Sequence, residues 1–253
     1  MIYTASGTPV VDRAFHNGVR TVDPITDGPR PLVAFWAGDP NGANGPGGAP
    51  LVNGDRIDRW RDPITGQYLT NTGGTARPVY ERSALMGGQW VARFLRTSNH
   101  HLVLPYVRAQ AYWAVLIAAF TGPTATTELV LATGQSGNAG IGKAGSTNQY
   151  FISAGTVIHS GVPWVADKPR LIVARFQGAS STQRIDKVTG TAGNPGTGAM
   201  TAFKLGSAGD GGLVGANSAT CEIGFAAIYD KDPYADNTGQ VLTALARDYG
   251  VDY

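Results

Sequence analysis

Residues 110 to 121 read QAYWAVLIAAFT, and this stretch indicates which architecture the chain adopts. Two alternating sets of side chains run through it, and both are apolar: Tyr112, Ala114, Leu116, Ala118 and Phe120 in one set, Trp113, Val115, Ile117 and Ala119 in the other. Successive side chains point to opposite faces of a strand, so a strand with two apolar faces is covered on both sides. We therefore expect a central strand in a layered β structure.

Further short runs of strand-forming residues are separated by glycine-rich turns such as 190–198 and 206–215. They lie at Pro31–Trp36, Trp90–Leu95, Thr127–Ala132, Gln149–Ala154, Arg170–Phe176, Gln183–Val188, Thr201–Leu205 and Glu222–Tyr229. One helix is predicted from about Thr238 to Tyr249, with Gly250 as its stop. Short strands without interleaved helices predict an all-β protein: an antiparallel β-sandwich (jelly roll) with one short C-terminal helix.

The chain has 253 residues, of which 42% are hydrophobic and 15% charged, as expected for a single folded β domain. Residues 1–30 are polar and rich in turn formers, so we expect an N-terminal arm that anchors the domain or joins it to another subunit; a loosely held terminus is the alternative. Residues 31–253 then form the domain. The N-terminus lacks the pattern of a secretory signal, and the longest apolar run is about half a membrane span, so we expect no membrane insertion.

The formal net charge is only +2 and the arginines are dispersed, so we expect no nucleic-acid partner. Cys221 is the only cysteine, which excludes a disulfide within the chain and a cluster of thiolate metal ligands. The stability of the fold must therefore come from packing.

Enzymatic signatures are missing from the sequence. Glycoside hydrolysis needs two carboxylates flanking the scissile bond, whereas the glutamates Glu81, Glu128 and Glu222 are widely separated along the chain. The Gly-x-Ser-x-Gly motif of many acyl-transfer enzymes is absent. Residues 137–143 nearly spell a phosphate-binding loop, but Ala144 replaces the required hydroxyl and a strand follows, so we interpret them as a hairpin connection. We predict that the chain is not an enzyme.

Two kinds of binding site are compatible with the sequence, one for a metal ion and one for a glycan. Adjacent histidines on a strand point to opposite faces, so His100 and His101 do not suggest a zinc site, and no cofactor is predicted apart from calcium at Asp230, Asp232 and Asp236. A glycan could stack on aromatic side chains near turns. The candidate glycan contacts are Trp164, Tyr150, His100, His101 and Tyr106, and the alternative is that these side chains cap the sandwich.

Several segments, in order, resemble the concanavalin A-like lectin/glucanase superfamily, in particular the laminin-G-like jelly rolls of bacterial surface proteins and tailed-bacteriophage virion proteins. They are Gly54–Asp62, Arg77–Tyr80, Gly87–Phe94, Tyr229 and Leu245–Val251. The chain departs from relatives at Phe225, where many carry a glutamate, and near Asp186 and Lys187, where an Asn-Gly turn is common. The glucanases' Glu-x-Asp-x-x-Glu strand is missing.

The resemblance implies a non-enzymatic structural protein of a tailed-bacteriophage virion, assembled in the host cytoplasm. A minor tail or tail-tip component that contacts host glycan is the first choice, and a capsid decoration or head-fibre protein is the alternative. The partners would be other virion proteins and further copies of the chain. A carbohydrate-binding or glycan-cleaving module is the alternative from another class.

Overall fold

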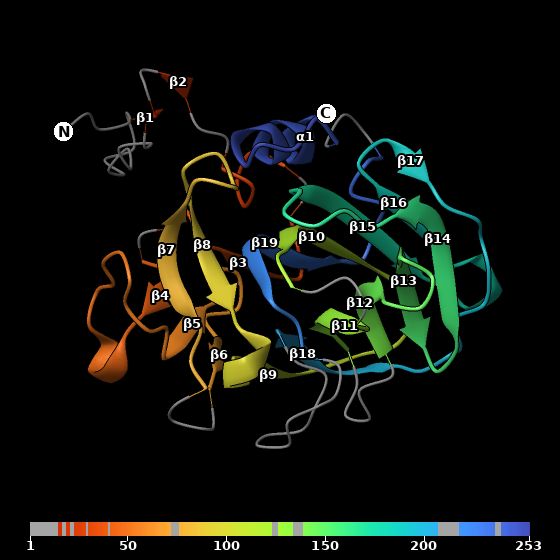
Figure 1. Cartoon of the computed structure of the whole chain (residues 1–253), viewed down its shortest axis with the longest axis horizontal. Helices are drawn as coiled ribbons and strands as arrows, with labels where there is room; N and C mark the ends of the chain where they lie inside the picture. Colours follow the sequence, from red (N-terminus) through yellow and green to blue (C-terminus); the bar gives the residue numbers. More distant parts are fainter. Residues whose placement is uncertain are drawn as a thin grey trace, which may run out of the picture.

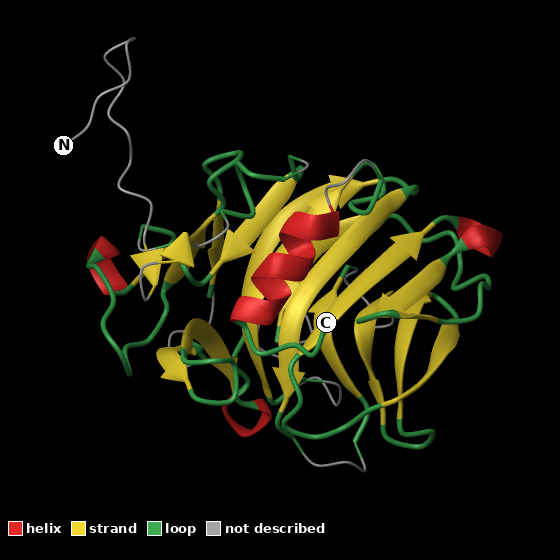
Figure 2. Ribbon diagram, turned by 90° about the horizontal axis from the view of Figure 1, so that it is seen from above, coloured by secondary structure: helices red, strands yellow, loops and turns green. Residues whose placement is uncertain are grey.

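The computed structural model describes residues 15–16, 19–20, 23–28, 30–39, 41–71, 76–122, 126–133, 139–206, 218–235 and 239–253. Two antiparallel sheets face each other, and within these residues one α-helix, α1 (Gly239–Asp248), lies against one of the sheets (Figures 1 and 2). The predicted all-β sandwich with a short C-terminal helix is confirmed.

One sheet has eight strands in the order β17-β16-β15-β10-β19-β8-β7, with β3 paired to β19 as well. Its strands are β3 (Val33–Trp36), β7 (Val79–Ser83), β8 (Gln89–Phe94), β10 (Tyr112–Phe120), β15 (Arg170–Phe176), β16 (Thr182–Ile185), β17 (Val188–Thr189) and β19 (Cys221–Tyr229).

The other sheet has nine strands in the order β14-β13-β12-β11-β18-β9-β6-β5-β4. Its strands are β4 (Ala43–Asn44), β5 (Arg59–Arg61), β6 (Tyr68–Thr70), β9 (Leu102–Arg108), β11 (Glu128–Ala132), β12 (Ala139–Ala144), β13 (Gln149–Ala154), β14 (Val157–Pro163) and β18 (Met200–Leu205). A separate pair is formed by β1 (Phe15–His16) and β2 (Val19–Arg20), and short 3-10 turns lie at Pro46–Gly48, Arg96–Ser98 and Gly178–Ser180.

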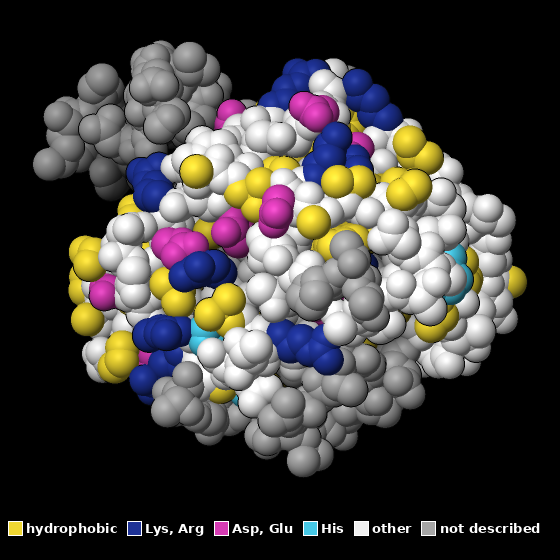
Figure 3. All heavy atoms as spheres, viewed as in Figure 1, with side chains coloured by type: hydrophobic (Ala, Val, Ile, Leu, Met, Phe, Trp, Pro, Cys, Tyr) yellow, Lys and Arg dark blue, Asp and Glu magenta, His cyan; other side chains and the backbone are white. Residues whose placement is uncertain are grey.

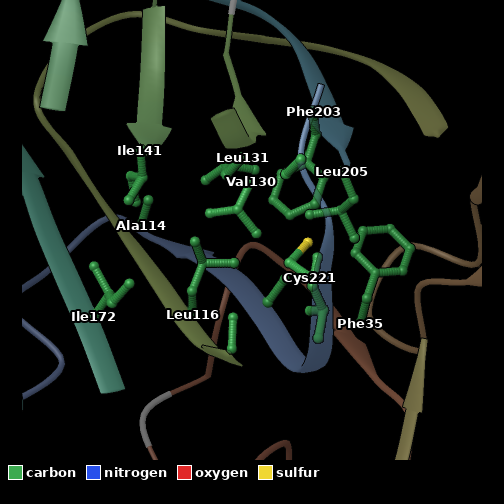
Figure 4. Packing of buried hydrophobic residues seen from close by; sticks show 14 of the residues in the cluster. Phe35, Ala114, Leu116, Val130, Leu131, Ile141, Ile172, Phe203, Leu205 and Cys221 are labelled. Atoms are coloured by element: carbon green, nitrogen blue, oxygen red, sulfur yellow. The ribbon is translucent and has the colours of Figure 1, made fainter. Parts of the chain in front are cut away.

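Strand β10 lies between β15 and β19, and it is covered on both faces as its sequence predicts. Leu116 points into the space between the sheets, where it meets Val130 of β11 and Cys221 of β19 (Figure 4). Neighbours on β10, such as Ile117, point to the opposite face and pack in a second apolar cluster. Side chains of both sheets therefore interlock in one core, and the eight-stranded sheet carries a second core on its outer face.

Helix α1 covers that second core because its apolar stripe faces the sheet (Figure 2). Leu242 and Leu245 are buried there. The helix ends where Gly250 takes φ +76°, and the N–H groups of Gly250 and Val251 bond back to the carbonyls of Arg247 and Ala246. This is the glycine stop that the sequence predicts.

The prediction of a hairpin connection at residues 137–143, the segment that resembles a phosphate-binding loop, is wrong. Within the described residues this segment forms strand β12, not a hairpin connection. A side chain at Gly140 would lie 2.0 Å from the carbonyl oxygen of Leu131, and one at Gly142 would lie 2.1 Å from that of Glu128. The glycines are therefore needed for the close approach of two strands rather than for a turn.

Most of the predicted arm, residues 1–30, lies outside the described residues, so its anchoring role and the division at residue 30 stay predictions. Ile25, which is described, packs against the apolar cluster beneath α1. The described part of the chain contains no helix with the length and apolarity needed to span a membrane.

Candidate functional site

A group of ionisable side chains lies on the outer face of the eight-stranded sheet, where β7, β8 and β19 are neighbours. Alternation along each strand places them there: Tyr80, Ala92 and Ile223 point into the core between the sheets, so Glu81, Arg93 and Glu222 point away from it. Figure 3 shows acidic side chains and a basic one close together on the surface over these strands. We call Glu81, Arg93, Glu222 and Ser83 the acidic site.

Glu222 is the buried member of the acidic site, with only 8% of its surface exposed. The Ser83 hydroxyl donates a hydrogen bond to its Oε2 atom. Burial raises the pKa of the Glu222 carboxyl, the Ser83 bond and Arg93 oppose this shift, and the nearby negative charges of Glu81 and Asp167 reinforce it. The neutral form of Glu222 is therefore favoured more than that of an ordinary glutamate.

Glu81 is the charged member. Its Oε1 atom lies 3.0 Å from Nε of Arg93, and both side chains are partly exposed. Because it is paired with a guanidinium, Glu81 is a carboxylate that accepts protons or hydrogen bonds rather than donating them.

The strand register explains how the two glutamates come together. Arg93 of β8 is paired with Glu222 of β19 on one side and with Val79 of β7 on the other. Glu81 and Ser83 follow Val79 on the same face of β7, about 6.6 Å apart. Ser83 holds the Glu222 carboxyl, and the charge of Glu81 raises the pKa of that carboxyl, so the two glutamates are close enough to interact.

Two carboxyl groups of which one is buried with a raised pKa and the other is ion-paired and partly exposed can act as a proton donor and a proton acceptor. Glu222 suits the donor role because it is buried and surrounded by negative charge. Glu81 suits the acceptor role because it is ion-paired and reaches solvent. Such a pair is the minimum that glycoside hydrolysis requires.

The aromatic and histidine residues predicted to contact glycan lie mainly in the interior. Exposed fractions are 3% for Trp164, 0% for Tyr150, 1% for His100 and 5% for His101, and Tyr106 is half-buried against the core. Burial and the adjacent Arg56 lower the pKa of His100 to about 4. The structure therefore places four of the five as core residues, without a ring face open to a ligand.

The partner of Trp164 shows what these rings do. Nζ of Lys143, a buried cation, lies 4.1 Å from the centre of the Trp164 ring. A desolvated ammonium is stabilised by the face of an indole ring. Trp164 thus covers a buried charge, which is close to the capping role given above as the alternative.

The predicted calcium ligands are only partly described. Asp230 and Asp232 are exposed, Oδ1 of Asp232 accepts a hydrogen bond from the backbone N–H of Tyr234, and Asp236 lies outside the described residues. Over those residues, no group of three or more His, Cys, Asp or Glu side chains is placed to hold a metal ion.

No protein-family model matches the chain, and no curated protein matches it in sequence. Solved structures match it in fold. A Trypanosoma rangeli sialidase in complex with 2,3-difluorosialic acid aligns with a TM-score of 0.52 and 14% identity over 97% of this chain and 37% of the sialidase. A GH54 α-L-arabinofuranosidase soaked with a cyclic sulfate inhibitor gives 0.56 and 13% over 87% of this chain and 63% of the enzyme.

An arabinofuranosidase in complex with arabinofuranosyl-α-1,2-xylobiose also aligns, with a TM-score of 0.52 and 14% identity over 77% of this chain and 51% of that enzyme. The chain thus spans between about a third and two thirds of the length of these structures. Identities this low show the fold alone: the chain has a β-sandwich that is also found in glycosidases.

The prediction that the chain is not an enzyme is contradicted by these similarities, because the three solved structures described above are glycosidases that share its fold. Its premise also fails. Glu81 and Glu222 are far apart in the sequence, but β8 brings both to one face of one sheet. None of the three structures is a virion protein, so the bacteriophage assignment stays a prediction from sequence resemblance.

Proposed function

We propose that the chain is a carbohydrate-active module of the concanavalin A-like type, which binds a glycan over the acidic site and cleaves a glycosidic bond there. Glu222 is the proton donor and Glu81 the proton acceptor. The observation that carries the proposal is the unequal environment of these two carboxyl groups on one face of the sheet. The fold shared with a sialidase and two arabinofuranosidases supports it at the level of architecture.

The proposed reaction follows from the two environments. Glu222 transfers its proton to the glycosidic oxygen while the bond from that oxygen to the anomeric carbon breaks. A water molecule attacks the anomeric carbon, and Glu81 takes up the proton that this water loses. Oε2 of Glu222 accepts the Ser83 hydrogen bond, so Oε1 is the oxygen that carries the reactive proton.

Arg93 has a positioning role in this scheme. Its guanidinium lies beside Glu81 and opposite Glu222 in the strand register. It holds the Glu81 side chain in place and opposes protonation of the Glu222 carboxyl. Loss of Arg93 is expected to raise the pKa of Glu222 further, because the Arg93 charge lowers it, and to release the Glu81 side chain from its ion pair.

The test is turnover by the purified chain. It is incubated with arabinoxylan, sialyl-lactose, polygalacturonate and dextran, and the release of reducing ends or free sialic acid is measured. Glu222→Gln and Glu81→Gln are each expected to lower the rate at least about 100-fold. The matched control Asp230→Asn removes an exposed carboxylate elsewhere and is expected to leave the rate unchanged.

Thermal unfolding of every variant shows whether a lost rate reflects lost structure. The proposal is overturned if none of the four substrates is bound or cleaved, or if both glutamine variants keep full turnover. An equal loss of turnover in the control variant Asp230→Asn would show that the reaction does not depend specifically on the acidic site.

The virion role inferred from the sequence remains a separate prediction, together with self-association and binding to other virion proteins. The virion role is tested by locating the chain in purified bacteriophage particles with an antibody. Absence of the chain from every particle would exclude that role.

A further inference from the structure

A second surface feature lies at the C-terminal segment. An open hollow of about 570 Å³ is lined by Lys187, Arg247, Gly250, Val251, Asp252 and Tyr253. It is bounded by the turn after β16 and by the residues that follow α1. We call it the basic hollow.

The aromatic wall of the basic hollow is fixed by hydrogen bonds and ring contacts. The hydroxyl groups of Tyr253 and Tyr234 lie 3.0 Å apart. The guanidinium of Arg184 lies 4.2 Å from the Tyr234 ring and 5.7 Å from the Tyr253 ring, and it donates a hydrogen bond to the Tyr253 hydroxyl. Tyr253 is therefore held in one orientation, so that its ring costs little conformational entropy when a ligand binds.

Three charged residues line the basic hollow, of which Lys187 and Arg247 are positive and Asp252 is negative. Lys187 and Arg247 are exposed, and neither forms an ion pair with a carboxylate anywhere in the described ranges. Asp252, the acidic residue of the lining, is paired with Lys168 at 3.3 Å. Lys187 Nζ lies 5.6 Å from the centre of the Tyr253 ring, and the Arg247 guanidinium donates a hydrogen bond of 3.3 Å to the Tyr253 carbonyl, so two exposed cations lie around one fixed tyrosine.

Residues of the basic hollow lie next to residues that contact or influence the acidic site. Lys168, which pairs with Asp252 of the hollow, follows Asp167, whose charge acts on Glu222. The segment after α1 also approaches the turn after β7, since a side chain at Gly87 would lie 3.4 Å from the backbone nitrogen of Gly250. In Figure 3 basic side chains gather near α1 and the C-terminus, on the same side of the molecule as the acidic group.

We infer that the basic hollow is a binding site for the anionic group of an acidic glycan, with Lys187 and Arg247 as its cationic contacts and Tyr253 as the ring against which a sugar lies. Arginine and lysine donate charge-assisted hydrogen bonds to carboxylate or sulfate groups. An aromatic face packs against the apolar face of a sugar ring. The inference rests on the proposed function, because it names the class of glycan that the acidic site would receive.

The experiment measures binding of three oligosaccharides of similar length by calorimetry: polygalacturonate, which carries carboxylates, heparin, which carries sulfates, and neutral dextran. The wild-type chain is expected to bind at least one acidic oligosaccharide ten times more tightly than dextran. The double variant Lys187→Gln/Arg247→Gln is expected to lose at least tenfold in that affinity. The double variant Arg30→Gln/Arg61→Gln changes the net charge equally at exposed positions elsewhere and is expected to lose less than threefold.

Each outcome bears on the inference. Equal affinity for dextran and both acidic oligosaccharides overturns it, and so does an equal loss in the two double variants, which would indicate a general charge effect. Comparison of the affinities for polygalacturonate and heparin shows whether the basic hollow prefers carboxylate or sulfate groups. If acidic glycan binds through Lys187 and Arg247 while Glu222→Gln and Glu81→Gln leave turnover unchanged, the proposed cleavage at the acidic site is wrong. The inference that the basic hollow binds acidic glycan would then still hold.

Discussion

The contact between Gly224 and Tyr249 gives the sharpest test of how α1 is fixed over the sheet. Gly224 is a residue of β19, two positions after Glu222, and a side chain built on it would lie 2.2 Å from Cε1 of the Tyr249 ring. The ring has no room to withdraw, because it is buried and its hydroxyl donates to the carbonyls of Trp90 and Gly224, each at 3.2 Å. Gly224→Ala therefore forces the ring off its position.

Overpacking of this kind costs about 2–3 kcal/mol. For a domain of this size each kcal/mol lowers the melting temperature by about 2–4 °C, so Gly224→Ala is expected to melt about 4–12 °C below the wild type. The assay is thermal unfolding followed by circular dichroism.

A second substitution shows whether the Tyr249 ring is the cause. In a Tyr249→Leu background the ring is gone, so Gly224→Ala is expected to cost less than it does in the wild type, and the difference between the two costs measures the coupling. A Gly224→Ala variant that melts within about 1 °C of the wild type would refute the steric reasoning. An equal cost in both backgrounds would refute the role of the ring.

Three further predictions concern buried groups. The pKa of the Glu222 carboxyl is raised in the folded chain above its ordinary value of 4.5. The folded state therefore keeps Glu222 protonated at a pH where the unfolded chain has lost that proton, and the wild type loses stability as the pH rises. The melting temperature of Glu222→Gln relative to that of the wild type should increase with pH, and a difference that does not change with pH would contradict this. Gly140→Ala should destabilise by more than about 3 kcal/mol in chemical denaturation, because its Cβ would lie 2.0 Å from a Leu131 oxygen; a normal midpoint would argue against the strand contact. Lys143→Met should cost about 3–5 kcal/mol because it leaves buried Glu128 with only the partly exposed Arg96, at 4.0 Å, as a cation; a smaller loss for the Lys143→Met/Glu128→Gln pair would confirm the coupling.

Much of the fold can be predicted from strand periodicity. Strands β13 and β15 begin and end at the residues predicted, and β10 is central because both of its faces are apolar. Strand β12 was not predicted, since Gly140 and Gly142 carry no side chain to alternate. Their role depends on the carbonyl oxygens of another strand, which no local pattern reveals.

The candidate site was harder to predict because it depends on register. The polar positions of β7 and β19 signal an outer face, but which two of them meet is set by their common neighbour β8. The aromatic residues show the opposite problem. Tyr150 and Trp164 lie near turns in the sequence, yet a strand end in a sandwich still points half of its side chains inward, and large aromatic rings fill that space.

Two buried glutamates in this fold have a raised pKa, and their surroundings separate a structural role from a functional one. Glu128 has the Lys143 ammonium at 3.9 Å, a hydrogen bond from Thr126 and another from the Thr220 backbone. Burial raises the pKa of Glu128, while these three neighbours and Arg96, at 4.0 Å, lower it. A carboxylate compensated in this way contributes to the interior and has little reason to give up or accept a proton.

Glu222 is compensated far less. Ser83 donates to it and Arg93 faces it, but Glu81 and Asp167 act in the opposite direction, and the Arg93 guanidinium is itself paired with Glu81. Packing does not require two more carboxylates near a buried one, and the negative charges of Glu81 and Asp167 disfavour the charged form of Glu222. An arrangement that costs stability and keeps one carboxyl ready to donate a proton is expected where chemistry is carried out. Of the two buried glutamates, Glu222 is therefore the one on which the proposed activity depends.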